Sequence, residues 1–422
     1  MGCIGQESKQ QILDRFASHV SSGKADFFER VGIDFVFGRR DGVYVWDVEG
    51  KQRLIDCHCN GGVFNLGHRN PRVIAALSVA LQELDIGNHH FVSEHRALLA
   101  ERLTALCPGD LKRVVFGVGG GEAVDMALKL ARAHTRRSDV IFAQGGYHGH
   151  TGLALAAGDS TYNAPFGPLS PGFVAVPFGD LEALEVVMDE DTAAVILETI
   201  PATMGIVVPP EEYFPGVRRL CDQHGVVMIQ DEVQTGLGRC GAVWGIDTYG
   251  VVPDILVTAK GLSGGIYPIS ATIYREHLDP FLRANPFIHV STFGGSEVGC
   301  YAALEVVCIL NEPGFLDHVR EMSGVFQKGL SWLQGRHPGL LVQVRQRGLM
   351  MGLRLASPAL GPLLTLAGFQ FGLLTIFANY DPSVNQLLPP LTIQKEEAQE
   401  VLQALDGMLA WVSEYAAHAA QS

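Results

Sequence analysis

The sequence is short of positive charge, and of lysine in particular. Lysine and arginine together number 31 against 45 aspartates and glutamates, which gives the 422-residue chain a formal charge of −14. Nucleic acids and anionic membrane surfaces bind clustered lysine and arginine, so this balance argues against either as the main partner. The few lysines stand at positions 9, 24, 51, 112, 129, 260, 328 and 395.

The sequence also lacks a dense set of cysteines and an unbroken apolar segment of membrane-spanning length. Its 8 cysteines are scattered over a long chain, which indicates reduced thiols and a cytoplasmic setting. We expect no secretory segment after the N-terminus. Cys57-His58-Cys59 lacks the two-residue gap of a zinc site and no second pair follows, so no metal is expected. Residues 355–380 carry no charge, but prolines and glycines interrupt them, and a buried strand and helix are predicted there.

Short apolar runs alternate with helical segments along the middle of the chain. Near-continuous apolar strands with helices between them predict an α/β fold with a mainly parallel sheet that is covered on both faces. Helices are predicted at 122–135 and 212–224. The predicted strands are residues 113–116, 140–143, 173–176, 194–197, 226–229, 255–258 and 269–274.

The two ends of the chain follow other patterns. Residues 8–30 predict one amphipathic helix, 42–56 a β-hairpin that turns at Glu49-Gly50, and Asn70-Pro71 and 94–106 two further helices. Towards the C-terminus, helices are predicted at 298–310, 316–334 and 395–417, and strands at 340–344 and 349–355. We therefore predict an N-terminal arm belonging partly to a small domain (1–60), a large ligand-binding domain (61–310) and a C-terminal small α+β domain (311–422).

Lys260 directly follows the apolar run 255–259 and directly precedes glycines, which places its amine at the end of a buried strand. Desolvation lowers the pKa of a lysine, and a neutral amine is what a Schiff-base nucleophile needs. The alternative is a surface lysine whose stem covers apolar groups while its charge stays in water.

The residues after the other predicted strands form a chemically consistent set, because ligands bind at the carboxyl ends of parallel strands. The glycine run 117–121 opens a helix and suits a phosphate, whereas a dinucleotide fingerprint would need a third glycine where Glu122 stands. Glu198 and Asp231 follow two further strands, with capping of the next helix as the alternative. Tyr147 adds an aromatic plane. A phosphate cradle, an aromatic ring, an aspartate and a desolvated lysine together indicate pyridoxal phosphate.

Nearly the whole chain resembles the class III pyridoxal-phosphate-dependent aminotransferases of fold type I. The resemblance implies a large domain with a mainly parallel sheet, a smaller α+β domain, and a homodimer with shared active sites. The matching motifs are Leu66-Gly67-His68, Gly120-Gly121-Glu122-Ala123, Tyr147-His148-Gly149, Asp231-Glu232-Val233-Gln234-Thr235-Gly236, Lys260-Gly261-Leu262, Ser291-Thr292-Phe293-Gly294-Gly295 and Leu388-Pro389-Pro390-Leu391.

The resemblance also implies roles for individual residues. Lys260 would form the Schiff base and move the proton, Asp231 would keep the ring nitrogen protonated, and Tyr147 would complete the catalytic set. The remaining cofactor contacts would be Val233 and Tyr147 on the ring faces, His148 beside the cofactor, Gln234 on the ring hydroxyl, Gly120 and Gly121 on the phosphate, Glu198 towards the substrate, and Thr292 on the phosphate bound by the neighbouring subunit.

Three positions depart from the pattern of the family. His150 and Gln386 stand where arginines often bind substrate carboxylates, and Thr203 stands where a glutamate often shields the second arginine. Neutral groups replace a bidentate arginine poorly, so we predict an aminotransferase acting on an amine or an unusual amino acid. His150, Gln386 and Arg39 are candidate substrate residues, with Arg40 or Arg354 as other carboxylate ligands.

The phosphate-binding glycines also depart from the family pattern. Gly119 and Gly121 stand where hydroxyl residues are common, which removes a possible phosphate donor. The alternative function is a non-transaminating enzyme of the same fold, namely a lyase, epimerase, decarboxylase or bond-forming enzyme of secondary metabolism.

Overall fold

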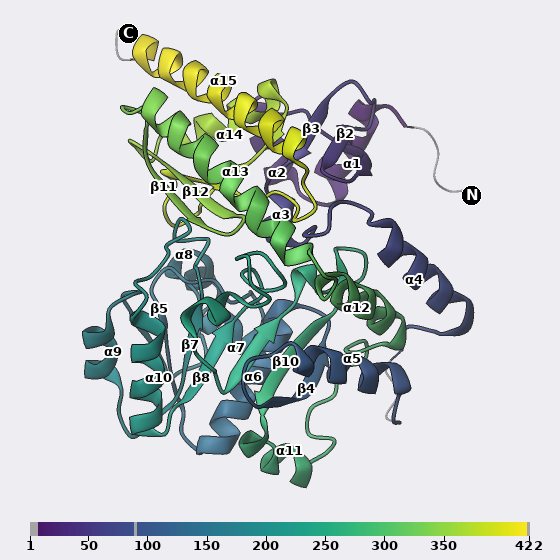
Figure 1. The fold of residues 1–422 in the computed structure, drawn as a ribbon, viewed down its shortest axis with the longest axis vertical. Coiled ribbons are helices and arrows are strands. Elements are labelled where there is room, and N and C mark those ends of the chain that lie inside the picture. The colour runs from purple at the N-terminus through teal and green to yellow at the C-terminus, as the bar shows by residue number, and fades with distance from the viewer. Residues whose placement is uncertain (1–6, 88–90, 420–422) are drawn as a thin grey trace.

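The structure, a computed structural model, describes residues 7–87 and 91–419 and is built around a seven-stranded sheet (Figure 1). The start of the chain, where we expect no secretory segment, lies partly outside the described residues. β10 is antiparallel to both of its neighbours and the other pairs are parallel, so the sheet is mainly parallel as predicted. The strands lie in the order β4 (Leu111–Gly117), β10 (Ser270–Arg275), β9 (Ile255–Thr258), β8 (Val227–Asp231), β7 (Thr192–Glu198), β5 (Asp139–Ala143) and β6 (Phe173–Val176).

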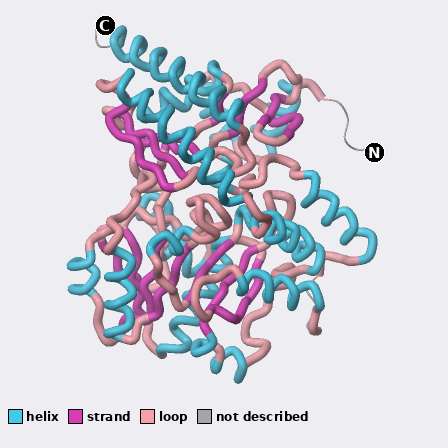
Figure 2. The backbone as a smooth tube through the Cα atoms, in the orientation of Figure 1, coloured by secondary structure: helices cyan, strands magenta, loops and turns pink. Residues whose placement is uncertain are grey.

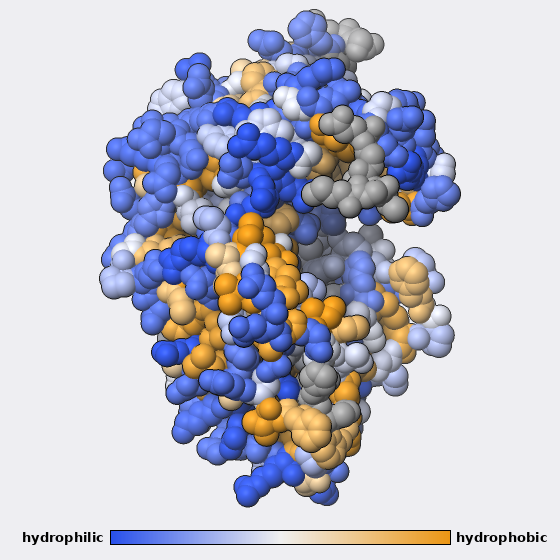
Figure 3. Space-filling model, turned by 90° about the vertical axis from the view of Figure 1, so that its right-hand side faces the viewer, coloured by the Kyte–Doolittle hydropathy of each residue, from blue (hydrophilic) through white to orange (hydrophobic). Residues whose placement is uncertain are grey.

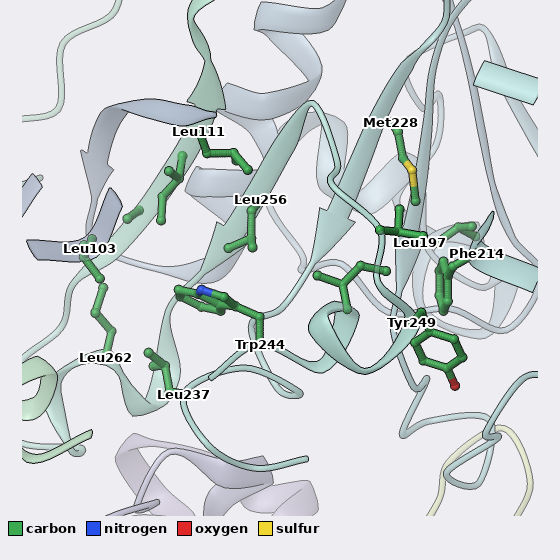
Figure 4. Packing of buried hydrophobic residues seen from close by; sticks show 14 of the residues in the cluster. Leu103, Leu111, Leu197, Phe214, Met228, Leu237, Trp244, Tyr249, Leu256 and Leu262 are labelled. Atoms are coloured by element: carbon green, nitrogen blue, oxygen red, sulfur yellow. The ribbon is translucent and has the colours of Figure 1, made fainter. Parts of the chain in front are cut away.

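Both faces of this sheet are buried, which explains the continuous apolar runs. In β7, Val195 and Leu197 belong to one hydrophobic cluster and Ala194 and Ile196 to another, because successive side chains point to opposite faces. The first cluster includes α5 (Glu94–Ala105), α10 (Tyr213–His224) and α12 (Glu297–Leu310), and the second includes α6 (Gly120–Thr135) and α7 (Gly152–Ala156). Figure 4 shows Trp244 among the leucines of the first cluster.

Chain segments from both ends form the upper part of the molecule in Figure 1. There β13 (Leu373–Leu374) pairs with β3 (Arg53–Asp56), and one hydrophobic cluster joins residues 43–57 to residues 319–412. The division at 60/61 and 310/311 stays a prediction. The two small sheets have the orders β1 (Phe37–Asp41), β2 (Tyr44–Asp47), β3, β13, and β11 (Leu341–Arg347), β12 (Met350–Leu355), β15 (Val384–Leu387), β14 (Ile376–Phe377), with helices α13 (Phe315–Arg336), α14 (Leu360–Phe371) and α15 (Lys395–Ala419).

The prediction of a single helix over 8–30 is wrong, because the segment forms two helices, α1 (Lys9–His19) and α2 (Ser22–Arg30). The Ser21 side chain accepts a hydrogen bond from the backbone N–H of Lys24, and this N-cap starts the second helix. α4 (Pro71–Glu83) begins at its proline with Asn70 as N-cap, as predicted. The remaining elements are α3 (Cys59–Gly62), α8 (Ser160–Asn163), α9 (Leu181–Val187), α11 (Pro280–Ala284), η1 (Ala164–Phe166), η2 (Gly245–Tyr249), η3 (Lys260–Ser263) and η4 (Glu276–Leu278).

Within the described residues, no single helix is long and apolar enough to cross a membrane; α12 and α13 reach that threshold only as a pair bent by 69°. The side of the molecule that carries α4, α5 and α12 faces the viewer in Figure 3 and shows broad apolar areas. Phe91 and Val92, just before α5, are 83% and 99% exposed. Phe287, Ile288, Val290 and Phe293, in the segment before α12, are exposed as well.

Candidate active site

The carboxyl ends of the parallel strands meet at one cavity of about 460 Å³. Glu198 and Asp231 are the last residues of β7 and β8 and are paired across the two strands, while Lys260 lies two residues beyond the end of β9. Figure 2 shows loops gathered between the end of the central sheet and the upper part of the molecule. The lining comprises residues 63, 118–121, 147–151, 198, 231, 233, 234, 259, 260, 263 and 265–269.

Asp231 is a buried carboxylate whose two oxygens are both engaged. Its Oδ1 accepts the backbone N–H of Val233 at 3.0 Å, and its Oδ2 lies 2.7 Å from Nδ1 of the buried His148. Burial alone would lower the pKa of His148, but the hydrogen bond and charge of Asp231 and the charge of Glu198 outweigh burial and raise it. His148 Nε2 is buried and has no hydrogen-bond partner among the described residues.

Lys260 lies at the start of η3 with a left-handed backbone (φ 44°), which is rare for a residue other than glycine. Its Nζ donates a hydrogen bond to Gln234 Oε1 at 3.1 Å. Desolvation lowers the pKa of the amine, although the charges of Glu198 and Asp231 oppose the shift. The neutral amine expected from the sequence is therefore favoured by the surroundings of the residue.

A left-handed turn that was not predicted from the sequence packs against this amine. Residues 59–62 all have positive φ, and a Cβ on Gly61 would stand 3.4 Å from Lys260 Nζ. The turn is fixed by buried Asp56, whose Oδ1 accepts the backbone N–H groups of His58 and Cys59 and whose Oδ2 lies 2.9 Å from Nε2 of buried His68. Burial, together with the charge of Lys260, lowers the pKa of His58 to about 4, although Asp56 opposes the shift.

Glu198, the buried last residue of β7, contacts the backbone of Tyr147. Its Oε1 accepts the backbone N–H of Tyr147 at 3.0 Å. Burial raises the pKa of Glu198 to about 7; His148, the Tyr147 hydrogen bond and Lys260 oppose the shift, and Asp231 adds to it. Burial also raises the pKa of the Tyr147 hydroxyl. Near neutral pH, Glu198 is thus poised between its protonated and ionised forms.

Glu232, next to Asp231 in the sequence, stabilises the local structure and does not line the cavity. It is fully buried and accepts hydrogen bonds from the hydroxyls of Thr199 and Thr235 and from the backbone N–H groups of Gly245 and Ile246. Burial raises its pKa to about 7 even though these donors oppose the shift. These contacts hold the segment that carries Asp231 and Val233.

The expected phosphate cradle lies at the N-terminus of the sixteen-residue helix α6, where residues 118–121 line the cavity. A Cβ on Gly120 would approach Val233 Cγ1 to 3.3 Å and one on Gly121 would approach Thr151 Oγ1 to 2.6 Å, so side chains here would be crowded. The free backbone N–H groups and the dipole of a helix N-terminus suit a phosphate.

The candidate substrate residues are dispersed. His150 lines the cavity and contacts the rings of Tyr147 and Tyr162, with centroids 5.1 and 5.2 Å away. Gln386 is buried in β15 and Arg39 is exposed beside Asp41, and neither lines the cavity. Thr203 donates its hydroxyl hydrogen to the carbonyl oxygen of Gly145, and its own carbonyl accepts the N–H of Tyr380.

Of the expected cofactor residues, Thr292 alone lies outside the cavity lining. It is exposed in the segment before α12. The structure brings together residues 120, 121, 147, 148, 198, 231, 233, 234 and 260 around the cavity. From the sequence no role was assigned to Asp56, Thr151 or Thr199, and His68 appeared only within the matching motif Leu66-Gly67-His68. Asp56 is the last residue of β3 and Thr199 directly follows β7, and that position at the end of a strand is the signal that could have found them.

The residues present fit pyridoxal phosphate. A helix N-terminus suits the phosphate, buried Asp231 suits a protonated ring nitrogen, and the desolvated Lys260 amine suits an aldehyde. The mainly parallel sheet and this set of groups at its carboxyl edge define a fold type I pyridoxal-phosphate enzyme.

Comparisons with known proteins identify the family within that class. The sequence model described as Aminotransferase class-III matches residues 29–409. An uncharacterized aminotransferase of Archaeoglobus fulgidus is 55% identical over 97% of this chain and 96% of its own length. A putrescine aminotransferase of Pectobacterium atrosepticum is 36% identical over 95% of this chain and 90% of its own. The crystal structure of the ornithine aminotransferase of Toxoplasma gondii covers 97% of each chain with a TM-score of 0.89 at 27% identity.

The chain belongs to the class III aminotransferases. It is a pyridoxal-phosphate-dependent enzyme that transfers amino groups between amines or amino acids and carbonyl compounds.

Proposed function

We propose that this aminotransferase acts on a primary amine whose reacting carbon carries no carboxylate. The single observation that supports it most is that none of the described residues lining the cavity is an arginine. A carboxylate next to the reacting carbon would need a bidentate cationic partner, which a histidine or glutamine replaces poorly. The 36% identity to a putrescine aminotransferase supports the same class of substrate.

Two of the departures from the family pattern lie in local surroundings that do not open onto the cavity. The hydroxyl of Thr203 binds the Gly145 carbonyl, and the ring of Tyr380 packs against Gly145. Gln386 is buried within the small sheet. The rings of Tyr147, His150 and Tyr162 pack together. Such an aromatic surface suits the alkyl chain of a substrate or, through cation–π contact, a second ammonium group.

The geometry supports the following proposed residue roles. When bound, pyridoxal phosphate supplies an aldehyde that condenses with amines and a ring that accepts electrons. Lys260 Nζ is desolvated and donates a hydrogen bond to Gln234. It would provide the nucleophile and move the proton at the amine-bearing carbon. Asp231, backed by His148, would hold a proton on the ring nitrogen. Residues 120 and 121 would bind the phosphate, and Tyr147 and Val233 would flank the ring.

We also propose a homodimer with shared active sites. The exposed apolar side chains at 91–92 and 287–293 favour burial against a second copy, because large exposed apolar patches mark interfaces. Thr292, in the same exposed segment, would then reach the phosphate bound by the partner.

We also propose that the enzyme works in the cytoplasm, because its cysteines are scattered along the chain as is typical of proteins with reduced thiols.

The test is a half-reaction of the purified holoenzyme with single amino donors. With 1,4-diaminobutane or a monoamine, we expect the cofactor absorbance to convert to that of its amino form at least 100-fold more efficiently than with glutamate. Equal or faster conversion with glutamate would contradict the proposal. His150→Arg is the matched variant. It should reduce the ratio of the efficiency with the amine to that with glutamate by about 10-fold or more, because it adds a charge-assisted hydrogen-bond donor for a carboxylate. Product release with the cofactor remaining in its aldehyde form would indicate the non-transaminating alternative.

A further inference from the structure

The phosphate cradle of this chain has no side-chain hydroxyl of its own. Glycines occupy positions 119, 120 and 121, and Gly119, the N-cap of α6, forms no side-chain capping hydrogen bond. Backbone N–H groups are therefore the only donors that these three residues can offer to a phosphate. A phosphate has three strongly accepting oxygens, so a further donor would add affinity.

A hydroxyl from another segment stands at the position that a cradle side chain would occupy. Thr151 lines the same cavity, and its Oγ1 lies 2.6 Å from the place where a Cβ on Gly121 would be. Its Cγ2 is farther from that place, at 3.4 Å, so the hydroxyl and not the methyl group is turned towards the start of α6. Gly149 allows this approach, since a Cβ there would stand 2.7 Å from Gly121 Cα.

Thr151 is the N-cap residue of α7, and a threonine at that position normally accepts a hydrogen bond from the backbone two or three residues later. Here it makes no such bond. Asp125, on α6, accepts the backbone N–H of Ala154 at 2.7 Å and so takes over the capping. The hydroxyl of Thr151 is thereby released from its ordinary local role.

We propose that the Thr151 hydroxyl donates a hydrogen bond to the phosphate of pyridoxal phosphate, in place of the hydroxyl that the cradle lacks at 119 and 121. Asp125 acts as a positioning residue. Its carboxylate accepts the backbone N–H of Ala154 at the N-terminus of α7, so the Thr151 hydroxyl is not needed for that bond. This inference concerns how the cofactor is held, so it stands or falls independently of the amine specificity proposed above.

The first test compares the Kd of the full-length apoenzyme for pyridoxal phosphate and for pyridoxal, which lacks the phosphate. Thr151→Val keeps the shape and removes the donor, and we expect it to raise the Kd for pyridoxal phosphate about 10-fold or more while leaving the Kd for pyridoxal within about 2-fold. Thr151→Ser should retain wild-type affinity for both. The matched control is Thr161→Val, an exposed threonine on the neighbouring helix α8, which should change neither Kd.

Three results would overturn the assignment: no change in affinity in Thr151→Val, an equal change for the two ligands, or a Thr151→Ser variant as weak as Thr151→Val. The equal change would identify Thr151 as a packing residue.

A reciprocal exchange keeps the assignment testable if Thr151→Val is poorly folded. Gly121→Ser alone would place its side chain against Thr151 Oγ1 and weaken cofactor binding. Combining it with Thr151→Ala removes that contact and restores a hydroxyl, so the double variant should bind pyridoxal phosphate more tightly than either single variant. A double variant as weak as the sum of the two single changes would contradict the proposal.

Discussion

The two ends of the active-site cavity are built on different principles. At the cofactor end, Asp231 lies 2.7 Å from His148 and accepts the backbone N–H of Val233 at 3.0 Å. Lys260 donates a hydrogen bond to Gln234 at 3.1 Å. At the substrate end, His150 is exposed and is held by ring contacts with Tyr147 and Tyr162. Hydrogen-bonded buried groups have fixed geometry, whereas exposed aromatic contacts can adjust. In the proposed function, the chemistry would thus be set by rigid elements and the choice of amine by adaptable ones.

The difference is also electrostatic. Charged and titratable groups concentrate at the cofactor end, where burial and neighbours shift the pKa values of His148, Glu198 and Lys260. The substrate end holds His150 and the rings around it and has no arginine among its described lining residues. Substitutions at the cofactor end should therefore alter chemistry and titration together, in a way that substitutions around His150 should not.

The largest effect is expected from Lys260→Ala. Without the amine the enzyme would lose the nucleophile and proton carrier proposed above, so kcat/KM should fall on the order of 10⁴-fold or more. The visible absorbance band of the bound cofactor should disappear as well. Lys328→Ala, at an exposed site on α13, serves as the control and should match the wild type. An unchanged spectrum in Lys260→Ala would refute the assignment.

A smaller loss, on the order of 10²-fold in kcat/KM, is expected from Asp231→Asn, which keeps the shape but removes the charge. Because Asp231 is one of the groups that raise the pKa of His148, this pKa should fall in the variant, as measured by NMR titration of the ring. Asp222→Asn, at an exposed ion pair with Arg218, should leave both quantities unchanged. Full activity with an unaltered His148 titration would show that the pair does not act as described.

A further effect concerns stability and pH. The native pKa of Glu198 is raised to about 7, so between its ordinary value of 4.5 and about 7 the folded state holds a proton that the unfolded chain releases. The free energy of unfolding should therefore fall as pH rises through this window, by up to about 3 kcal/mol.

Glu198→Gln should remove this part of the slope in denaturant titrations of the apoenzyme. Glu232, whose pKa is raised in the same way, is retained and continues to contribute. The exposed Glu185→Gln is the control for the general effect of charge removal. Identical slopes in wild type and Glu198→Gln would contradict the expectation.

Much of the fold was predictable because the central sheet is buried on both faces. Its continuous apolar runs predicted all seven strands, and Asp231 and Lys260 could be found as the residues that follow two of them. Capping residues and prolines predicted where α4 begins. The antiparallel direction of β10 was not predicted, since an apolar run of this length carries no information on direction.

The unpredicted features all depend on contacts between segments far apart in the chain. Asp56 fixes the turn 59–62 that packs against Lys260, and His68 contacts Asp56, yet nothing in their local sequence points to position 260. The free hydroxyl of Thr151 depends on Asp125 taking over a helix cap, which only the packing of α6 against α7 creates. The structural role of Glu232 depends on hydrogen-bond donors at positions 199, 245 and 246, which are remote from it in the sequence.

The left-handed backbone of Lys260 has a consequence for how this enzyme can be stabilised. A non-glycine residue at φ 44° carries strain on the order of 1 kcal/mol, and glycine would relieve it. The substitution that best suits the backbone at this position is therefore one that removes the amine proposed as the nucleophile. Selection for thermal tolerance and selection for catalysis oppose each other at this residue, so a more heat-resistant enzyme must gain its stability elsewhere in the chain.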